Sequence, residues 1–80
     1  MSATPPQPAV VVEAGGEPWT RVGPLLDRRT AEITAAAVIE ILTTDPSVRA
    51  ALPAWCAHRD ATLHPIGTTG FLVHLPARAH

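Results

Sequence analysis

Short apolar runs along the chain alternate with longer stretches whose apolar residues recur at helical spacing. The run at 9–14 is rich in β-branched residues and ends at a pair of glycines, which predicts a strand followed by a turn. The run at 37–43 is almost continuously apolar, which is typical of a central strand buried on much of both faces. A helical stretch separates the two runs, so they predict a βαβ unit with parallel strands.

Two helices are expected, and proline limits where each can begin. Proline is well placed in the first turn of a helix and poorly placed deeper in it. The first helix therefore begins either at Pro18, with a flaw at Gly23 and Pro24, or at Pro24. The second helix is expected over about 48–59, because Asp-Pro-Ser at 45–47 supplies a cap residue and a proline for the first turn.

The last two apolar runs, at 62–66 and 70–75, predict an antiparallel hairpin. Pro65 has no N–H for a ladder, which places its strand at an edge or beside a bulge. In the simplest register of this hairpin Gly67 faces Gly70. The register matters because it decides which side chains of the two strands share a face of the sheet.

The predicted order of elements is β-α-β-α-β-β, which gives an α+β fold. We expect a two-layer α/β sandwich, in which a four-stranded mixed sheet carries two helices on one face and its opposite face stays partly open. Residues 1–8 are rich in proline and are expected to form a disordered tail, and residues 9–80 are expected to form a single domain.

Residues 39–56 carry the most specific pattern in the chain. A strand-like segment ends in Asp-Pro at 45–46, an arginine follows at 49, and the block Leu-Pro-Ala-Trp-Cys occupies 52–56. This pattern resembles the second strand of the TusA/SirA family of sulfur carriers, its Asp-Pro ending, and the Leu-Pro, aromatic and cysteine positions that follow. The resemblance covers roughly residues 10–76 and implies the same βαβαββ fold, with a role in sulfur transfer.

In that family a Cys-Pro-x-Pro motif lies where the first strand gives way to the first helix, and its cysteine carries a persulfide. A helix N-terminus suits this chemistry because it stabilises a thiolate. Here the motif is absent: its cysteine position falls on Trp19 without gaps, or on Gly23 if a four-residue deletion is placed in the first helix. The resemblance therefore implies a sulfur-transfer protein that is degenerate at the usual persulfide site, and whether the chain is an enzyme stays open.

Cys56 is the only cysteine, so it is the only residue on which a persulfide could form. Arg49 and Arg59 lie on its side of the predicted helix and are candidate helpers that would favour a thiolate. Two arguments favour a structural role instead. Cys56 lies near the negative end of its helix, and a free cysteine on an apolar helix face is commonly a small buried hydrophobe.

Pro18, Trp19, Gly23 and Pro24 occupy the region of the family's motif and form a second candidate binding site. An exposed Trp19 would be a contact point for a partner, whereas a buried one would fill the gap between helix and sheet, which is the interpretation we favour. The alternative function is a non-catalytic adaptor or regulator that binds a partner protein through this corner or through the open sheet face. An accessory protein that binds a small molecule is a further alternative.

Neither a metal site nor a cofactor is expected. The four histidines stand at positions 58, 64, 74 and 80. If Gly67 faces Gly70, His64 and His74 point to opposite faces of the sheet, so they cannot converge on one metal ion.

Composition narrows the partners and the compartment. The net charge of −1 and the scattered arginines predict no direct binding to nucleic acid. No apolar run approaches the roughly 18 residues of a membrane span, and the N-terminus lacks a basic signal region. We therefore expect no membrane contact. A single thiol cannot form an internal disulfide, so nothing indicates an oxidising compartment and we expect a cytoplasmic location. The resemblance implies a protein partner, such as a cysteine desulfurase or a thiolation enzyme.

Overall fold

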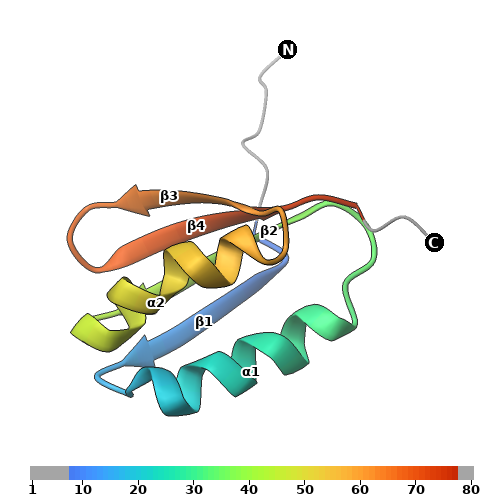
Figure 1. Ribbon diagram of the computed structural model, residues 1–80. Helices are drawn as coiled ribbons and strands as arrows, with labels where there is room; N and C mark the ends of the chain where they lie inside the picture. Colours follow the sequence, from blue (N-terminus) through green and yellow to red (C-terminus); the bar gives the residue numbers. More distant parts are fainter. Residues whose placement is uncertain (1–7, 78–80) are drawn as a thin grey trace.

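The computed structural model describes residues 8–77. Four strands and two helices follow one another in the predicted order (Figure 1). Their bounds are β1 Val10–Gly15, α1 Trp19–Ala31, β2 Ala37–Thr43, α2 Pro46–Ala57, β3 Thr62–Ile66 and β4 Gly70–Leu75. Within residues 8–77 neither helix is long and apolar enough to cross a membrane. The predicted N-terminal tail lies outside the described residues, apart from its last residue.

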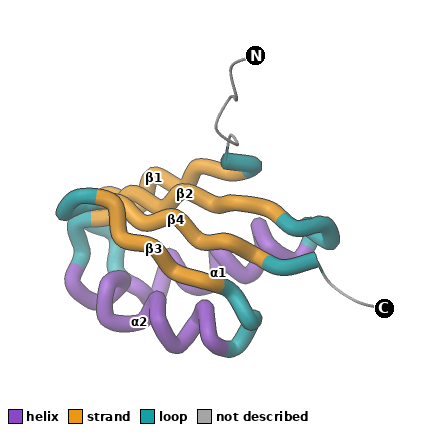
Figure 2. The backbone as a smooth tube through the Cα atoms, turned by 90° about the horizontal axis from the view of Figure 1, so that it is seen from above, coloured by secondary structure: helices purple, strands orange, loops and turns teal. Residues whose placement is uncertain are grey.

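The four strands form one mixed sheet in the order β1-β2-β4-β3. β1 is parallel to β2, and β4 is antiparallel to both of its neighbours. Figure 2 shows both helices on the same side of the sheet. The structure thus confirms the expected two-layer α+β fold, with β2 as an inner strand. β3 contains Pro65 and is an edge strand, which agrees with the missing N–H of proline.

The core lies between the sheet and the two helices. Alternate residues of β2 point into it, and Ile39 and Ile41 are completely buried there. Leu26 of α1 and Leu52 of α2 are completely buried in the same cluster. Burial of one such side chain stabilises the folded state by about 1.5–3 kcal/mol, so these contacts hold both helices on the sheet. The other buried apolar residues are Val12, Ala14, Val22, Val48, Trp55, Cys56, Phe71 and Val73.

α1 begins at Trp19, with Pro18 in the N-cap position and Pro24 inside the helix. The structure therefore has the earlier of the two starts that the sequence allowed. Packing explains why residue 23 is a glycine: a Cβ atom there would lie only 3.0 Å from Cε2 of Trp19. The N–H of Trp19 donates to Ser47 Oγ of α2 at 3.0 Å. The indole packing and this bond hold the first turn in place, although Pro24 removes a backbone donor further along the helix.

α2 begins at the predicted cap signal, slightly earlier than expected. The Asp45 carboxylate accepts the N–H of Ser47 at 2.8 Å and also the Ser47 hydroxyl. These bonds, the hydroxyl first, hold the pKa of Asp45 below its ordinary value. The helix ends in a Schellman motif, in which Asp60 has φ +54° and the Ala61 N–H donates to the Cys56 carbonyl oxygen at 2.9 Å. Both ends of α2 are therefore fixed by local hydrogen bonds.

The hairpin between β3 and β4 differs from the prediction by one residue. Ile66, and not Gly67, pairs with Gly70, so the loop contains three residues instead of two. Gly67 has φ +60°, a left-handed conformation that glycine adopts readily and that begins the wider turn. A shift of one residue moves a side chain to the other face of the sheet. The prediction that His64 and His74 point to opposite faces is therefore wrong, and both lie on the face away from the helices.

Candidate functional site

The corner where β1 leads into α1 is the place where the resemblance to sulfur carriers puts their motif, and hydrogen bonds join it to the end of β2. The carbonyl oxygen of Gly15 accepts the N–H of Thr44 at 2.8 Å and the hydroxyl groups of Thr43 and Thr44 at 3.4 and 3.2 Å. Trp19 is half-buried, lies beside Gly23 and packs against the core. The two prolines of this region are exposed. Neither position that could replace the family's cysteine carries a group able to hold sulfur.

The thiol of Cys56 lies inside the protein. The residue is 2% exposed and belongs to the core cluster. Burial raises the pKa of the thiol above its ordinary value, and the positive charge of Arg59 offsets only part of this effect. A thiol that exchanges sulfur must be deprotonated and reachable. In this conformation Cys56 meets neither requirement.

The two arginines that could assist the thiol lie in different surroundings. Arg59 forms an ion pair with Asp27 of α1, and its guanidinium carbon lies 4.2 Å from the ring centroid of Trp55. The Nε1–H of Trp55 donates to the same carboxylate at 2.9 Å, so one acidic side chain joins the two helices. Arg49 lies near the start of α2, with its guanidinium carbon 5.7 Å from the ring centroid of Phe71. Arg59 thus lies near the thiol, but its charge is paired with Asp27. Arg49 lies over Phe71 and not beside the thiol.

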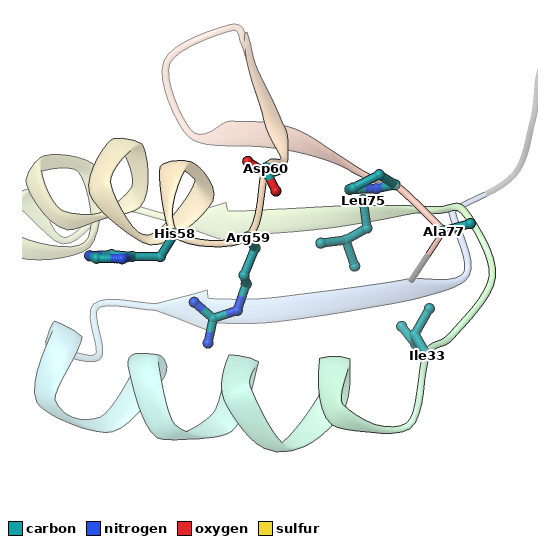
Figure 3. A pocket seen from close by; sticks show the side chains of 7 residues that line it. Ile33, His58, Arg59, Asp60, Leu75 and Ala77 are labelled. Atoms are coloured by element: carbon teal, nitrogen blue, oxygen red, sulfur yellow. The ribbon is translucent and has the colours of Figure 1, made fainter. Parts of the chain in front are cut away.

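A pocket of 560 Å³ lies where the chain leaves α1, α2 and β4 (Figure 3). Its lining residues are Ile33, His58, Arg59, Asp60, Leu75, Pro76 and Ala77. Figure 3 shows Arg59 and Leu75 pointing toward α1 from different elements. The lining contains no serine, threonine or cysteine that could act as a nucleophile. The sequence did not indicate this pocket, because its residues come from three segments that share no motif.

The side of the sheet away from the helices, called the open face below, carries exposed apolar side chains. Strand register places these residues on it: Val11, Glu13, Val38, Glu40, Leu42, Thr62, His64, Ile66, Leu72 and His74. Val11 is 51% exposed and Ile66 is 45% exposed, more than any other large hydrophobic residue between 8 and 77. The open face therefore combines an incompletely buried apolar surface with two carboxylates and two imidazoles.

Two apolar side chains of the open face lie beside Gly70, at the end of the sheet where the β3–β4 hairpin turns. A Cβ atom at Gly70 would lie 3.5 Å from Cδ2 of Leu42 and 3.7 Å from Cβ of Ile66. Gly70, which has no side chain, thus lies between Leu42 of β2 and Ile66 of β3. Leu72 follows on the same face of β4 and is half-buried. The open face thus has apolar side chains on β2, β3 and β4.

Charge is divided between the two sides of the molecule. Glu13 and Glu40 lie on the open face, on neighbouring strands. The arginines of residues 8–77 lie in α1, in α2 or directly after α2, and none of them lies in a strand. The carboxylates of the open face are therefore not balanced by arginine on that face in the described part of the chain. The open face is acidic, whereas the helical side carries most of the positive charge.

His64 and His74 lie on neighbouring strands of the open face, and their rings contact each other. The ring centroids are 4.9 Å apart and the ring planes are inclined by 79°. The sequence analysis placed the two histidines on opposite faces of the sheet. They would have been placed on the same face only if the hairpin loop had been given three residues instead of two. No group of three or more His, Cys, Asp or Glu side chains that could hold a metal ion is present between residues 8 and 77.

Neither a comparison with models of known protein families nor a sequence comparison with curated proteins gives a match. The choice among the candidate sites therefore depends on the residues and geometry of the chain itself. The corner has no group able to hold sulfur, the thiol is buried and the pocket holds no nucleophile. The open face is the remaining candidate, and it has exposed apolar and acidic groups available for contact.

Proposed function

We propose that this chain is a non-catalytic, partner-binding protein with a TusA/SirA-like scaffold, and that it binds its partner through the open face. The observation that supports this most is the exposure of Val11 and Ile66 on a sheet face that the helices leave uncovered. Apolar surface that stays in contact with water is a common mark of an interaction site. A partner that covers this face removes that apolar surface from water. The complex is then stabilised by the hydrophobic effect, which also stabilises the core.

The charges of the open face indicate the chemistry of the partner. Glu13 lies beside Leu42, and Glu40 lies between Val11 and Leu72. A partner that combines apolar side chains with arginine or lysine opposite these carboxylates would complement them. Such charges guide the encounter and select among partners, while the apolar contacts supply most of the affinity. Within the resemblance to sulfur carriers, a cysteine desulfurase or a thiolation enzyme is the class of partner to test first.

The sulfur-carrier role has a direct test of its own. In that role Cys56 would receive sulfur as a persulfide, which requires the thiol to reach the donor. The burial of Cys56 and its raised pKa favour the binding role over the carrier role. After incubation with a cysteine desulfurase and cysteine, we expect the intact mass of the protein to be unchanged. A gain of one sulfur atom that disappears in Cys56→Ala would support the carrier role instead.

The binding role is tested by crosslinking from defined positions. A photo-reactive amino acid is placed at Val11, at Ile66 or at Leu25, the last being an exposed hydrophobic residue of α1 on the helical side. We expect the same partner to be crosslinked from the two open-face positions and not from Leu25. The purified partner should then bind wild type and lose most of its affinity for Ile66→Arg, while Leu25→Arg binds normally. Equal crosslinking from all three positions, or equal binding of both variants, would contradict the proposal.

A further inference from the structure

The contact between His64 and His74 is a feature that partner binding does not explain. The two residues come from adjacent antiparallel strands and are diagonal neighbours, because His64 pairs with Leu72 and His74 pairs with Thr62. Both side chains are exposed, and the ring centroids lie 4.9 Å apart. Two imidazoles held this close on one rigid sheet are partly arranged to bind a common ligand before that ligand arrives.

The separation of the rings matches what one shared metal ion would require. A metal ion about 2.1 Å from one nitrogen of each imidazole, with an N–metal–N angle of about 90–109°, places the ring centroids about 4.5–5.3 Å apart. The observed 4.9 Å lies inside this interval. The rings now meet edge to face, so binding requires each ring to turn one nitrogen toward the ion. Because both side chains are exposed, such a turn does not disturb the core.

We propose that His64 and His74 form a two-histidine site for a divalent transition metal ion that prefers imidazole ligands, such as Zn²⁺, Ni²⁺ or Cu²⁺. Two coordination positions or more stay open for water or for another ligand. Exposure of both residues allows the ion to enter from solvent without any opening of the fold. The site depends on the hairpin register and does not depend on the partner-binding role.

The site is tested by titrating the full chain with Zn²⁺ and recording both calorimetry and the imidazole NMR signals. We expect one ion per chain and shifts confined to the ring signals of His64 and His74. The variants His64→Ala and His74→Ala should each bind about tenfold more weakly or worse, because one of two protein ligands is lost. His58→Ala and His80→Ala are matched controls, and they should bind as wild type does.

The ring signals of the unaltered protein keep the test decisive even if a variant folds poorly. No saturable binding of Zn²⁺ by wild type up to about 1 mM would overturn the proposal. Shifts that appear first at His58 or His80 would overturn it as well, since the ion would then prefer histidines outside the pair. Circular dichroism of each variant establishes that a loss of binding does not come from unfolding.

Discussion

The two faces of the sheet are made from the same strands but differ in how far their side chains are buried. On β2, Ile39 and Ile41 are completely buried under the helices, while Glu40 and Leu42 alternate with them and lie half-buried on the open face. On the helical side, Asp27 of α1 accepts a hydrogen bond from Trp55 of α2 and forms an ion pair with Arg59, just after α2. The open face has no such ties to another element in the described chain. The comparison shows that the fully buried side chains of the sheet lie on the helical side, whereas the open face keeps large apolar side chains in contact with water.

The contrast is tested most strongly by removing one leucine from each side. Leu52→Ala leaves a cavity in the core and should lower the free energy of unfolding by about 3 kcal/mol. Leu72→Ala removes a half-buried side chain from the open face and should lower it by less than about 1 kcal/mol. Urea unfolding of both variants measures the difference. Equal losses would mean that the open face also supports the fold.

A smaller effect is expected from the carboxylate that joins the helices. Asp27→Ala removes the acceptor of the Trp55 Nε1–H and the partner of Arg59, which should lower the free energy of unfolding by about 1.5 kcal/mol. The ion pair contributes little of this, because the Asp27 side chain is half exposed. Glu32→Ala, an exposed acidic position just after α1, is the control and should change stability by less than about 0.5 kcal/mol. In a Trp55→Phe background the effect of Asp27→Ala should shrink.

Because the Cys56 thiol is buried, the free energy of unfolding is expected to depend on pH in the alkaline range. The folded state raises the pKa of Cys56, so it keeps a proton that the unfolded chain releases above about pH 8.5. The contribution of this thiol to the free energy of unfolding is therefore fully present below that pH. It falls as the pH rises toward the pKa of the folded state, by at most about 1.4 kcal/mol per pH unit. The chain has neither tyrosine nor lysine, so Cys56 is its only side chain of a type that ordinarily titrates in this interval.

Urea unfolding between pH 8 and pH 10.5 measures this slope. Wild type should lose stability over the interval, whereas Cys56→Val should keep a nearly constant value apart from the terminal amine, which both proteins share. The same wild-type protein should react slowly with thiol reagents until urea unfolds it. A Cys56 that reacts at once in the folded protein would contradict burial and would bring the carrier role back.

The sequence was sufficient for the elements but not for the local geometry that defines the sites. Strand and helix periodicity predicted the βαβαββ order, because burial against one sheet face controls that pattern. The start of α1 was undecided, since Pro18 and Pro24 are both compatible with a first turn. Packing of the Trp19 indole on Gly23, one turn later in the helix, and the bond of Trp19 to Ser47 favour the earlier start. The bond to Ser47 joins residues 28 positions apart, so no local pattern contains it.

The histidine pair could not be predicted from the sequence because its geometry depends on the length of one hairpin loop. The two strands at 62–66 and 70–75 were correctly predicted, but the face assigned to each histidine depends on the hairpin register, which was not. Turn sequences with two glycines are compatible with loops of two or three residues. The sequence of this loop, Gly-Thr-Thr-Gly, fits both lengths, so His64 and His74 could not be placed together until the pairing of Ile66 with Gly70 was known.

The register itself is the subject of the smallest prediction. Gly67 has φ +60°, and a Cβ atom there would meet no heavy atom within 4 Å, so its replacement tests backbone conformation alone. Gly67→Ala should lower the free energy of unfolding by about 1 kcal/mol, the cost of a left-handed conformation for alanine. Thr68→Ala, in the same loop, should change it by less than about 0.5 kcal/mol. If both variants behave alike, the left-handed turn is not what sets the loop at three residues, and the shared face of His64 and His74 loses its structural cause.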